Sequence, residues 1–385
     1  MKNLILFLNE LEDPRDKRGL KHELTNIIVM CIYAILCGCT DCESIAYFLE
    51  LKKEYFINLL NLDKKYGVPS ADTLLRVFAI IDANKFMEIF SEWVNGIIIQ
   101  KSNAKGIKTI AIDGKAVKAA TDKINGGNIP YVVSAYLTDI GVSIGQVKVE
   151  DKTNEITAIP ELLDLIDITD CIITIDAIGT QTKIINKILN KKGNYCLPLK
   201  TNQKRAYEDV KEYFEYVENT KLEKDKLDTN IVIDKGHGRI EKRETSVITN
   251  FDKLEALNKF KDVKSIIKTV NYREINGKIS IQEKYYISNL KLSAKAFGNI
   301  TRKHWQIENN LHWTLDVYFK EDLSTAKKSN AIHNFSLLRK ICFNLIKLDD
   351  SVKRKEVNKR MMYYNHDLDN LKRLIFEIYP NTNQI

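Results

Sequence analysis

The sequence predicts an α/β protein: a mixed β-sheet with flanking helices, preceded by a helical N-terminal domain and interrupted by a β-rich segment. Apolar residues in 1–100 recur at three- and four-residue spacing, which is typical of helices. After about residue 106, short β-type runs alternate with helical patterns, which favours a sheet covered by helices. The predicted domains are 1–100, 104–348 with a β-rich insertion at about 204–290, and a helical tail at 349–385.

Spacing and turn residues place the individual elements in chain order. In the N-terminal domain, helical patterns cover 24–36, 44–60 and 84–99, and Ser70 in "GVPSADTLLRVF" is a predicted N-cap. The next domain begins with three strands separated by turn signals, and helices and strands then alternate. Its predicted strands are 107–113, 131–137, 142–149, 171–176 and 195–199, with helices at 157–168 and 180–191.

The segment from about 204 to 290 breaks this alternation. "NIVIDKGHGRIEKRETSVI" is typical of two strands around a Gly-His-Gly turn, and "VNYREING" and "KISIQEKYYIS" are typical of two more. Long helical patterns return from 293 to 348. We therefore expect the β-rich segment to be an insertion between two parts of the α/β domain.

Composition limits the classes of function without selecting one. The 385 residues carry a formal charge of +8, which permits a nucleic-acid partner but does not require one. The seven cysteines have irregular spacing, which predicts buried, reduced thiols rather than a zinc finger or disulfides. The longest apolar run, 27–39, is too short to span a bilayer and lacks the features of a signal peptide. We expect a cytoplasmic protein with no membrane partner.

Two aspartates follow short apolar strands. "TIAIDGKAV" contains Asp113 and "IITIDAIGT" contains Asp176. Asp-Gly is also a common turn pair, so Asp113 alone is at least as well explained as a turn residue. Functional groups gather at the carboxyl ends of strands, and two neighbouring carboxylates repel each other unless they share a proton or bind a cation. Carboxylate oxygens favour Mg²⁺ or Mn²⁺.

A third acidic ligand is expected from the helix "RKHWQIENNLHWTLDVYFKED". Its candidate carboxylates are Glu308, Asp316, Glu321 and Asp322. We assign Trp305 and Trp313 to the core, which makes the helix largely buried and leaves Glu308 in need of a partner rather than solvated. His304, Glu308 and His312 share one face of an ideal helix, so a zinc site is an alternative. Against it, the usual helical zinc motif places its histidines four residues apart.

Basic and polar residues near these acids are candidates for DNA contact. Lys115 is equally well explained as a phosphate contact or as a solvated turn lysine. The residues after strand 195–199 favour contact with a DNA backbone over a bland polar loop, and a basic hairpin tip suits DNA ends or is simply a solvated turn. The predicted DNA-contacting residues are Lys115, Lys200, Asn202, Gln203, Lys204, His237, Arg239, Arg243, His304 and His312.

Several stretches resemble the insertion-sequence DDE transposases, in the branch that includes the H-repeat-associated proteins. They are "AIDGKAVKAA", "EDKTNEITAIPELLDLID", "IITIDAIGTQ", "NYCLPLKTNQ", "GHGRIEKR" and "HWQIENNLHWTLDVYFKED", together with "DPRDKRGLKHEL" and "GVPSADTLLRVF" near the N-terminus. The resemblance is collinear and covers nearly the whole chain. It implies an RNase H-like fold in which Asp113, Asp176 and Glu308 hold two Mg²⁺ or Mn²⁺ ions.

The resemblance also implies partners and a reaction. The partners would be double-stranded DNA, as element terminal repeats and target DNA, and a second copy of the chain in a homodimer, in the bacterial cytoplasm at the nucleoid. The wider group carries Tyr-x₂-Arg-x₃-Glu-x₆-Lys, where this chain has Thr301, His304, Glu308 and Leu315. The histidine agrees with the branch, and the missing lysine bears on strand discrimination and end handling.

Three functions remain open at this point. The favoured one is a DDE transposase that cleaves element ends and transfers the 3′-OH into target DNA. The alternatives are a related metal-dependent nuclease without strand transfer and a domesticated, non-catalytic DNA-binding protein. The complete set of acids, Asp113, Asp176 and Glu308, argues against the last.

Overall fold

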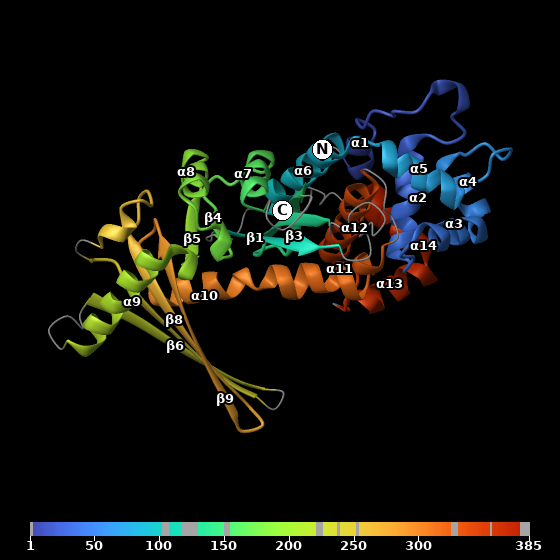
Figure 1. Cartoon of the computed structure of the whole chain (residues 1–385). Coiled ribbons are helices and arrows are strands. Elements are labelled where there is room, and N and C mark those ends of the chain that lie inside the picture. The colour runs from blue at the N-terminus through green and yellow to red at the C-terminus, as the bar shows by residue number, and fades with distance from the viewer. Residues whose placement is uncertain are drawn as a thin grey trace, which may run out of the picture.

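The chain folds around one large sheet that extends into a protruding ribbon of strands (Figure 1). The computed structural model describes residues 3–101, 108–117, 130–149, 155–220, 226–236, 239–251, 254–324, 330–354 and 356–377. All seven cysteines are free thiols, buried or half-buried. Across these ranges, every helix is too short or too polar to cross a bilayer.

Helices make up the N-terminal part of the chain. They are α1 (Leu4–Leu8), α2 (Leu24–Leu36), α3 (Cys42–Leu51), α4 (Lys53–Leu60), α5 (Ala71–Ile80) and α6 (Ala83–Lys101). Ser70 caps α5 as predicted, because its side chain accepts a hydrogen bond from the Thr73 N–H. Helix α2 is buried almost all round, since α12 (Ala331–Leu348) packs against both α2 and α5. The N-terminal helices therefore share one continuous apolar core with the C-terminal half of the chain.

The sheet has nine strands in the order β3-β2-β1-β4-β5-β9-β8-β7-β6. Its first half consists of β1 (Thr109–Ala116), β2 (Tyr131–Leu137), β3 (Val142–Val149), β4 (Ile172–Ile175) and β5 (Asn194–Leu199). Strands β1 to β3 are antiparallel neighbours, whereas β1, β4 and β5 run parallel. This mixed arrangement confirms the predicted fold class, an RNase H-like mixed sheet with flanking helices.

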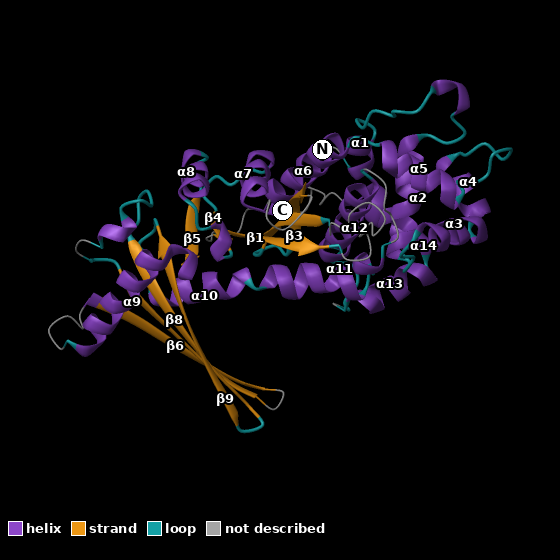
Figure 2. Cartoon of the chain, viewed as in Figure 1, coloured by secondary structure: helices purple, strands orange, loops and turns teal. Residues whose placement is uncertain are grey.

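Helices cover both faces of this half of the sheet. Helices α7 (Glu155–Leu165) and α8 (Thr182–Asn190) lie on one face, and α10 (Ala294–His304) and α11 (Trp313–Val317) lie on the other (Figures 1 and 2). Strand β1 continues to Ala116, beyond its predicted end at 113, because β2 pairs with it throughout that stretch. Asp113 therefore lies inside β1, at the point where the parallel pairing with β4 ends at Ile112 and Ile175.

The predicted β-rich segment forms the second half of the same sheet. Strands β6 (Leu227–Gly236), β7 (Arg239–Ile248), β8 (Ser265–Ile275) and β9 (Lys278–Ser288) make an antiparallel ribbon, here called the arm. The arm joins the first half of the sheet through antiparallel pairing of β9 with β5. Helix α9 (Lys204–Asn219), which the sequence analysis did not predict, packs against the base of the arm. The C-terminal residues add α13 (Val357–His366) and α14 (Leu368–Lys372), beside the N-terminal helices.

Candidate active site

Asp113 and Asp176 lie next to each other because of the register of two parallel strands. Ile112 of β1 is paired with Ile175 of β4, and each aspartate is the next residue in its chain. Asp176 begins the 3₁₀ turn Ala177–Gly179, and its carboxylate accepts a hydrogen bond from the Ile178 N–H at 2.9 Å. This cap fixes the orientation of the Asp176 side chain at the carboxyl edge of the sheet.

Glu308 comes from the helix on the other side of this edge. It lies in a π-helical segment, η8 (Ile307–His312), between α10 and α11, and its side chain is exposed. Burial raises the pKa of Asp113 to about 7, and the negative charges of Glu308 and Asp176 contribute to that rise. Glu308 and Asp176 are therefore both close enough to Asp113 to repel its negative charge, and we call the three carboxylates the acidic site.

A fourth carboxylate, Glu155, also acts on Asp113. It lies at the start of α7 and is buried, and its negative charge adds to the rise in the pKa of Asp113. It also packs against Gly114, where a Cβ atom would lie 2.4 Å from Glu155 Oε1. Glu155 had no predicted role, although it stands in one of the stretches that carry the family resemblance.

The donor chemistry of the acidic site fits a hard divalent cation. All three groups offer carboxylate oxygens, which Mg²⁺ and Mn²⁺ prefer, and a cation would relieve the repulsion at Asp113. Among the described residues, no three His, Cys, Asp or Glu side chains are gathered closely enough to hold a metal ion.

The zinc alternative is not supported, because His304 and His312 contact different groups. His304 Nδ1 is 3.0 Å from Thr174 Oγ1, and His312 Nδ1 is 3.5 Å from Asp113 Oδ2. Burial lowers the pKa of His304 to about 4 and that of His312 to about 3, so both rings are neutral at pH 7. His312 is buried, so it supports Asp113 rather than presenting itself to DNA.

A small cavity opens beside Asp176 and Glu308. It has a volume of about 160 Å³, and Lys200, Lys284, His304 and Trp305 are among the residues that line it. Burial and the nearby charge of Lys200 lower the pKa of Lys284, and the Lys284 ammonium lies 4.5 Å from the centre of the Trp305 ring. Lys284 was missed from the sequence, although its position directly before the apolar residues of "KYYIS" was the available signal.

The assignment of Trp305 and Trp313 to the core was wrong. Their exposed fractions are 43% and 51%, because the helix buries the opposite side, with Ile307 and Leu311, against the sheet. Trp305 instead stands between the small cavity and a larger groove, and both include it in their walls.

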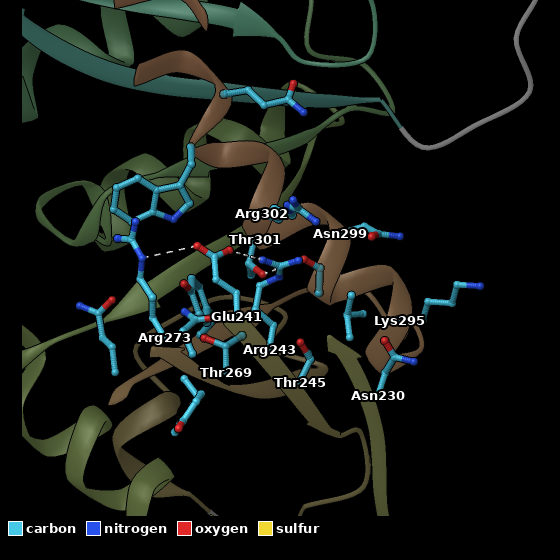
Figure 3. Close-up of a pocket in the computed structure, with 18 of the residues that line it drawn as sticks. Asn230, Glu241, Arg243, Thr245, Thr269, Arg273, Lys295, Asn299, Thr301 and Arg302 are labelled. Atoms are coloured by element: carbon cyan, nitrogen blue, oxygen red, sulfur yellow. Dashed lines mark hydrogen bonds and ion pairs between the residues drawn. The ribbon is translucent and has the colours of Figure 1, made fainter. Parts of the chain in front are cut away.

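The larger groove, here called the arm groove, runs between the arm and the helix α10–η8 (Figure 3). Its volume is about 790 Å³, and its wall is rich in arginine and amide side chains. The Glu241 carboxylate pairs with Arg243 at 2.9 Å, Arg239 at 3.3 Å and Arg273 at 3.5 Å. The amide-bearing residues in the wall are Asn230, Asn271, Gln282, Asn299, Gln306, Asn309 and Asn310.

The other predicted DNA contacts are placed as follows. Lys200 and Lys204 are exposed, and Asn202 donates a hydrogen bond to the Ala177 carbonyl at 2.8 Å, beside Asp176. Gln203 is buried and donates to the Thr180 carbonyl at 2.7 Å, so it braces the loop and is not available to DNA. His237 lies outside the described residues.

Lys115 has a structural role in place of the predicted contact with phosphate. Its side chain is 10% exposed, and its ammonium pairs with Asp316, Glu321 and Asp322 at 2.6, 3.0 and 3.0 Å. Burial lowers the pKa of Lys115, but the charges and hydrogen bonds of Glu321 and Asp316 outweigh it and raise the pKa. Lys115 is therefore not part of the DNA surface proposed below.

A sheet of this strand order, with carboxylates where its parallel strands end, defines a protein of the RNase H-like class. Residues 104–345 match the family described as "Transposase DDE domain", and residues 5–94 match the family "DDE_Tnp_1-associated". The chain belongs to the DDE transposase family.

Relatives in Escherichia coli K12 match almost end to end. The H repeat-associated putative transposase YhhI is 34% identical over 381 residues, which is 95% of this chain and 97% of YhhI. The protein YbfL is 35% identical over the same shares of both chains. Among solved structures, a piggyBac transposase synaptic complex with hairpin DNA is similar, with a TM-score of 0.41 and 11% identity over 99% of this chain and 84% of the other.

Proposed function

We propose that this protein cleaves DNA phosphodiester bonds at the ends of its element and joins the freed 3′-OH to target DNA. The observation that carries the proposal is the convergence of Asp113, Asp176 and Glu308 at one edge of the sheet, in a chain of the DDE transposase family. Members of this family generally act with divalent metal ions. The three carboxylates would hold two Mg²⁺ or Mn²⁺ ions, which supply Lewis acidity and activate the nucleophile.

Both steps are displacements at phosphorus. In cleavage, water attacks the phosphorus, the bond to the 3′ oxygen breaks, and a 3′-OH and a 5′-phosphate result. In joining, that 3′-OH attacks a target phosphodiester, a new bond forms, and a target 3′-OH leaves. The protein supplies position and charge, the main demands of phosphoryl transfer.

The side chains around the acidic site suit these tasks. Lys284 and Lys200 stand beside Asp176 and Glu308, where they can bind the phosphates next to the cut. His312 lies 3.5 Å from Asp113, and Glu155 adds a fourth negative charge that acts on it. Asn202 keeps the Asp176 loop in place through the Ala177 carbonyl.

The arm groove is the proposed path of the DNA backbone toward the acidic site. It is adjacent to the small cavity, and Thr301, Trp305 and Tyr286 line both. Arg239, Arg243 and Arg273 pair with Glu241, and Arg243 and Arg302 also pair with Asp234. Phosphates would replace these carboxylates when DNA binds. Amide side chains in the wall can hydrogen-bond to bases or sugars. Because an element has two ends, we propose a homodimer with one end at each acidic site.

The test uses a duplex that carries the inverted repeat flanking the gene, with a target plasmid and Mg²⁺. Binding, cleavage and joining are scored separately for the wild type, Glu308→Gln and a control. Glu308→Gln should abolish cleavage and joining while binding is retained. The control Glu215→Gln, an exposed carboxylate on α9 that pairs with Lys211 at 3.7 Å, should behave as wild type.

The outcomes separate the three candidate functions. Cleavage with joining supports the transposase, and cleavage without joining on a competent target supports the nuclease. Binding without cleavage in Mg²⁺ or Mn²⁺ supports the non-catalytic alternative. A folded and fully active Glu308→Gln would show that the third acid has been assigned to the wrong residue.

A further inference from the structure

Strand β1 and the helix that carries Glu308 are joined at two successive levels. His312 of the helix approaches Asp113 of the strand at 3.5 Å. Asp316 lies four residues after His312 on the helix, and Lys115 lies two residues after Asp113 on the strand. The Asp316 carboxylate and the Lys115 ammonium pair at 2.6 Å. Four helical residues rise about 6 Å and two strand residues about 6.7 Å, so the spacing of the two contacts is nearly the same along the helix and along the strand.

The Lys115 ammonium also binds the turn that follows the helix. It lies 3.0 Å from both Glu321 Oε2 and Asp322 Oδ1, in the 3₁₀ turn Glu321–Leu323. Lys115 is 10% exposed, and the Glu321 side chain 3%. A buried charge is tolerated only with its partners in place, so this arrangement resists any sliding of the helix along β1.

Helix α12 supports the cluster from behind. Glu321 interacts with the positive charges of Lys340 and Arg339, which are both buried. Lys340 donates to Gln146 Oε1 of β3 at 2.5 Å, and Arg339 donates to the Thr40 carbonyl at 3.2 Å. The cluster is therefore anchored both to the sheet and to the N-terminal helices.

We propose that Lys115, Asp316 and Glu321 are positioning residues, a clamp that holds Glu308 opposite Asp113 so that the two acids can share metal ions. The inference rests on the proposed two-ion function. The clamp touches neither DNA nor metal. It acts by fixing the register between β1, which carries Asp113, and the helix η8–α11, which carries Glu308.

The test measures Mn²⁺ binding to the full-length protein by electron paramagnetic resonance, without DNA, alongside steady-state cleavage. In Lys115→Met, Mn²⁺ should bind at least tenfold more weakly and kcat should fall at least tenfold, with KM for DNA unchanged. Lys115→Arg keeps the positive charge and should return both quantities to within about threefold of wild type.

A matched control separates positioning from general loss of stability. Lys268 is also a 10% exposed lysine paired with a carboxylate, Glu218 at 2.9 Å, but it lies at the base of the arm under α9. Lys268→Met should lower the melting temperature without changing Mn²⁺ affinity or kcat. If Lys115→Met does not fold, Asp316→Asn takes its place, because Lys115 then keeps two carboxylates. Mn²⁺ should bind at least threefold more weakly in that variant.

Two results would overturn the clamp. One is a folded Lys115→Met or Asp316→Asn with wild-type Mn²⁺ affinity and kcat, and the other is an equal loss of Mn²⁺ affinity in Lys268→Met. A wild-type protein that binds Mn²⁺ but does not cut end DNA would refute the proposed function instead. The Mn²⁺ titrations would still decide whether the clamp exists.

Discussion

Replacing Asp113 by Asn should stabilise the metal-free protein. The Asp113 side chain is only 21% exposed, and burial together with the charges of Glu308 and Asp176 raises its pKa from 3.8 to about 7. That difference corresponds to about 4 kcal/mol of unfavourable free energy for the ionised carboxylate in the folded state. Asparagine keeps the shape and removes the charge, so we expect about 2–4 kcal/mol of added stability at pH 8.

The pH dependence of this gain has a definite sign. Between pH 3.8 and about 7, the folded protein holds a proton on Asp113 that the unfolded chain has lost. The stability of the wild type therefore falls as the pH rises through this window. The advantage of Asp113→Asn should be absent near pH 4 and complete above about pH 7.

Thermal melting at pH 5 and pH 8, with and without Mg²⁺, measures the effect. At pH 8 without Mg²⁺ the variant should melt several degrees above wild type, and Mg²⁺ should raise the melting temperature of the wild type more than that of the variant. Cleavage by the variant should fall by orders of magnitude, while DNA binding is retained or tightened. The control Asp164→Asn removes a carboxylate that pairs with Lys187 at 2.5 Å on the surface, and should cost less than about 1 kcal/mol.

Two results would refute this reasoning. The first is an Asp113→Asn protein that is less stable than wild type at pH 8 without metal. The second is a stability gain that is the same at pH 5 and pH 8, because it could not then come from ionisation of Asp113.

Three further predictions concern the surroundings of the site. Gly114→Ala would place a Cβ atom 2.4 Å from Glu155 Oε1, so the buried glutamate must shift. This shift should cost about 1–3 kcal/mol of stability and slow cleavage, with DNA binding unchanged. A variant that melts and cleaves like the wild type would contradict this. Glu241→Gln frees Arg239 and Arg273 for phosphates, while Arg243 keeps its pairing with Asp234. The substitution should tighten binding of end DNA up to about tenfold at low salt, whereas weaker binding would show that Glu241 positions the arginines. Arg239→Ala combined with Arg243→Ala should reduce the slope of log affinity against log salt by about one per lost contact, and an unchanged slope and affinity would remove the arm groove from the DNA path.

Local patterns in the sequence were sufficient for the fold class and for most of the elements. Strands β2 and β3 have their predicted bounds, since alternation and turn residues are local signals. Strand β1 was predicted to end too early because β2 extends it, and that pairing depends on residues 15 to 19 positions further along the chain. The 16-residue helix α9 was missed because its mean hydropathy is low and only one side of it packs against the arm.

The acidic site was predictable in outline, but its supporting contacts were not. Asp113 and Asp176 stand out because each follows an apolar strand, whereas the partners of Lys115 lie about 200 residues further along the chain. The rule that placed His304, Glu308 and His312 on one face assumes 3.6 residues per turn. The π-helical segment Ile307–His312 breaks that period, and no residue in it is an obvious signal for a π-helix.

The length of the arm can change without altering the acidic site. Strands β8 and β9 are joined by Asn276 and Gly277, both with positive φ, which is the geometry of a tight two-residue hairpin turn. Adding two residues to each strand of the hairpin would lengthen it by about 6.8 Å and leave the pairing of β9 with β5 in register. A single extra residue in one strand would instead turn that strand's groove-facing side chains to the opposite face. Insertions in matched pairs are therefore the changes by which related proteins could adapt the arm to DNA ends of different shape.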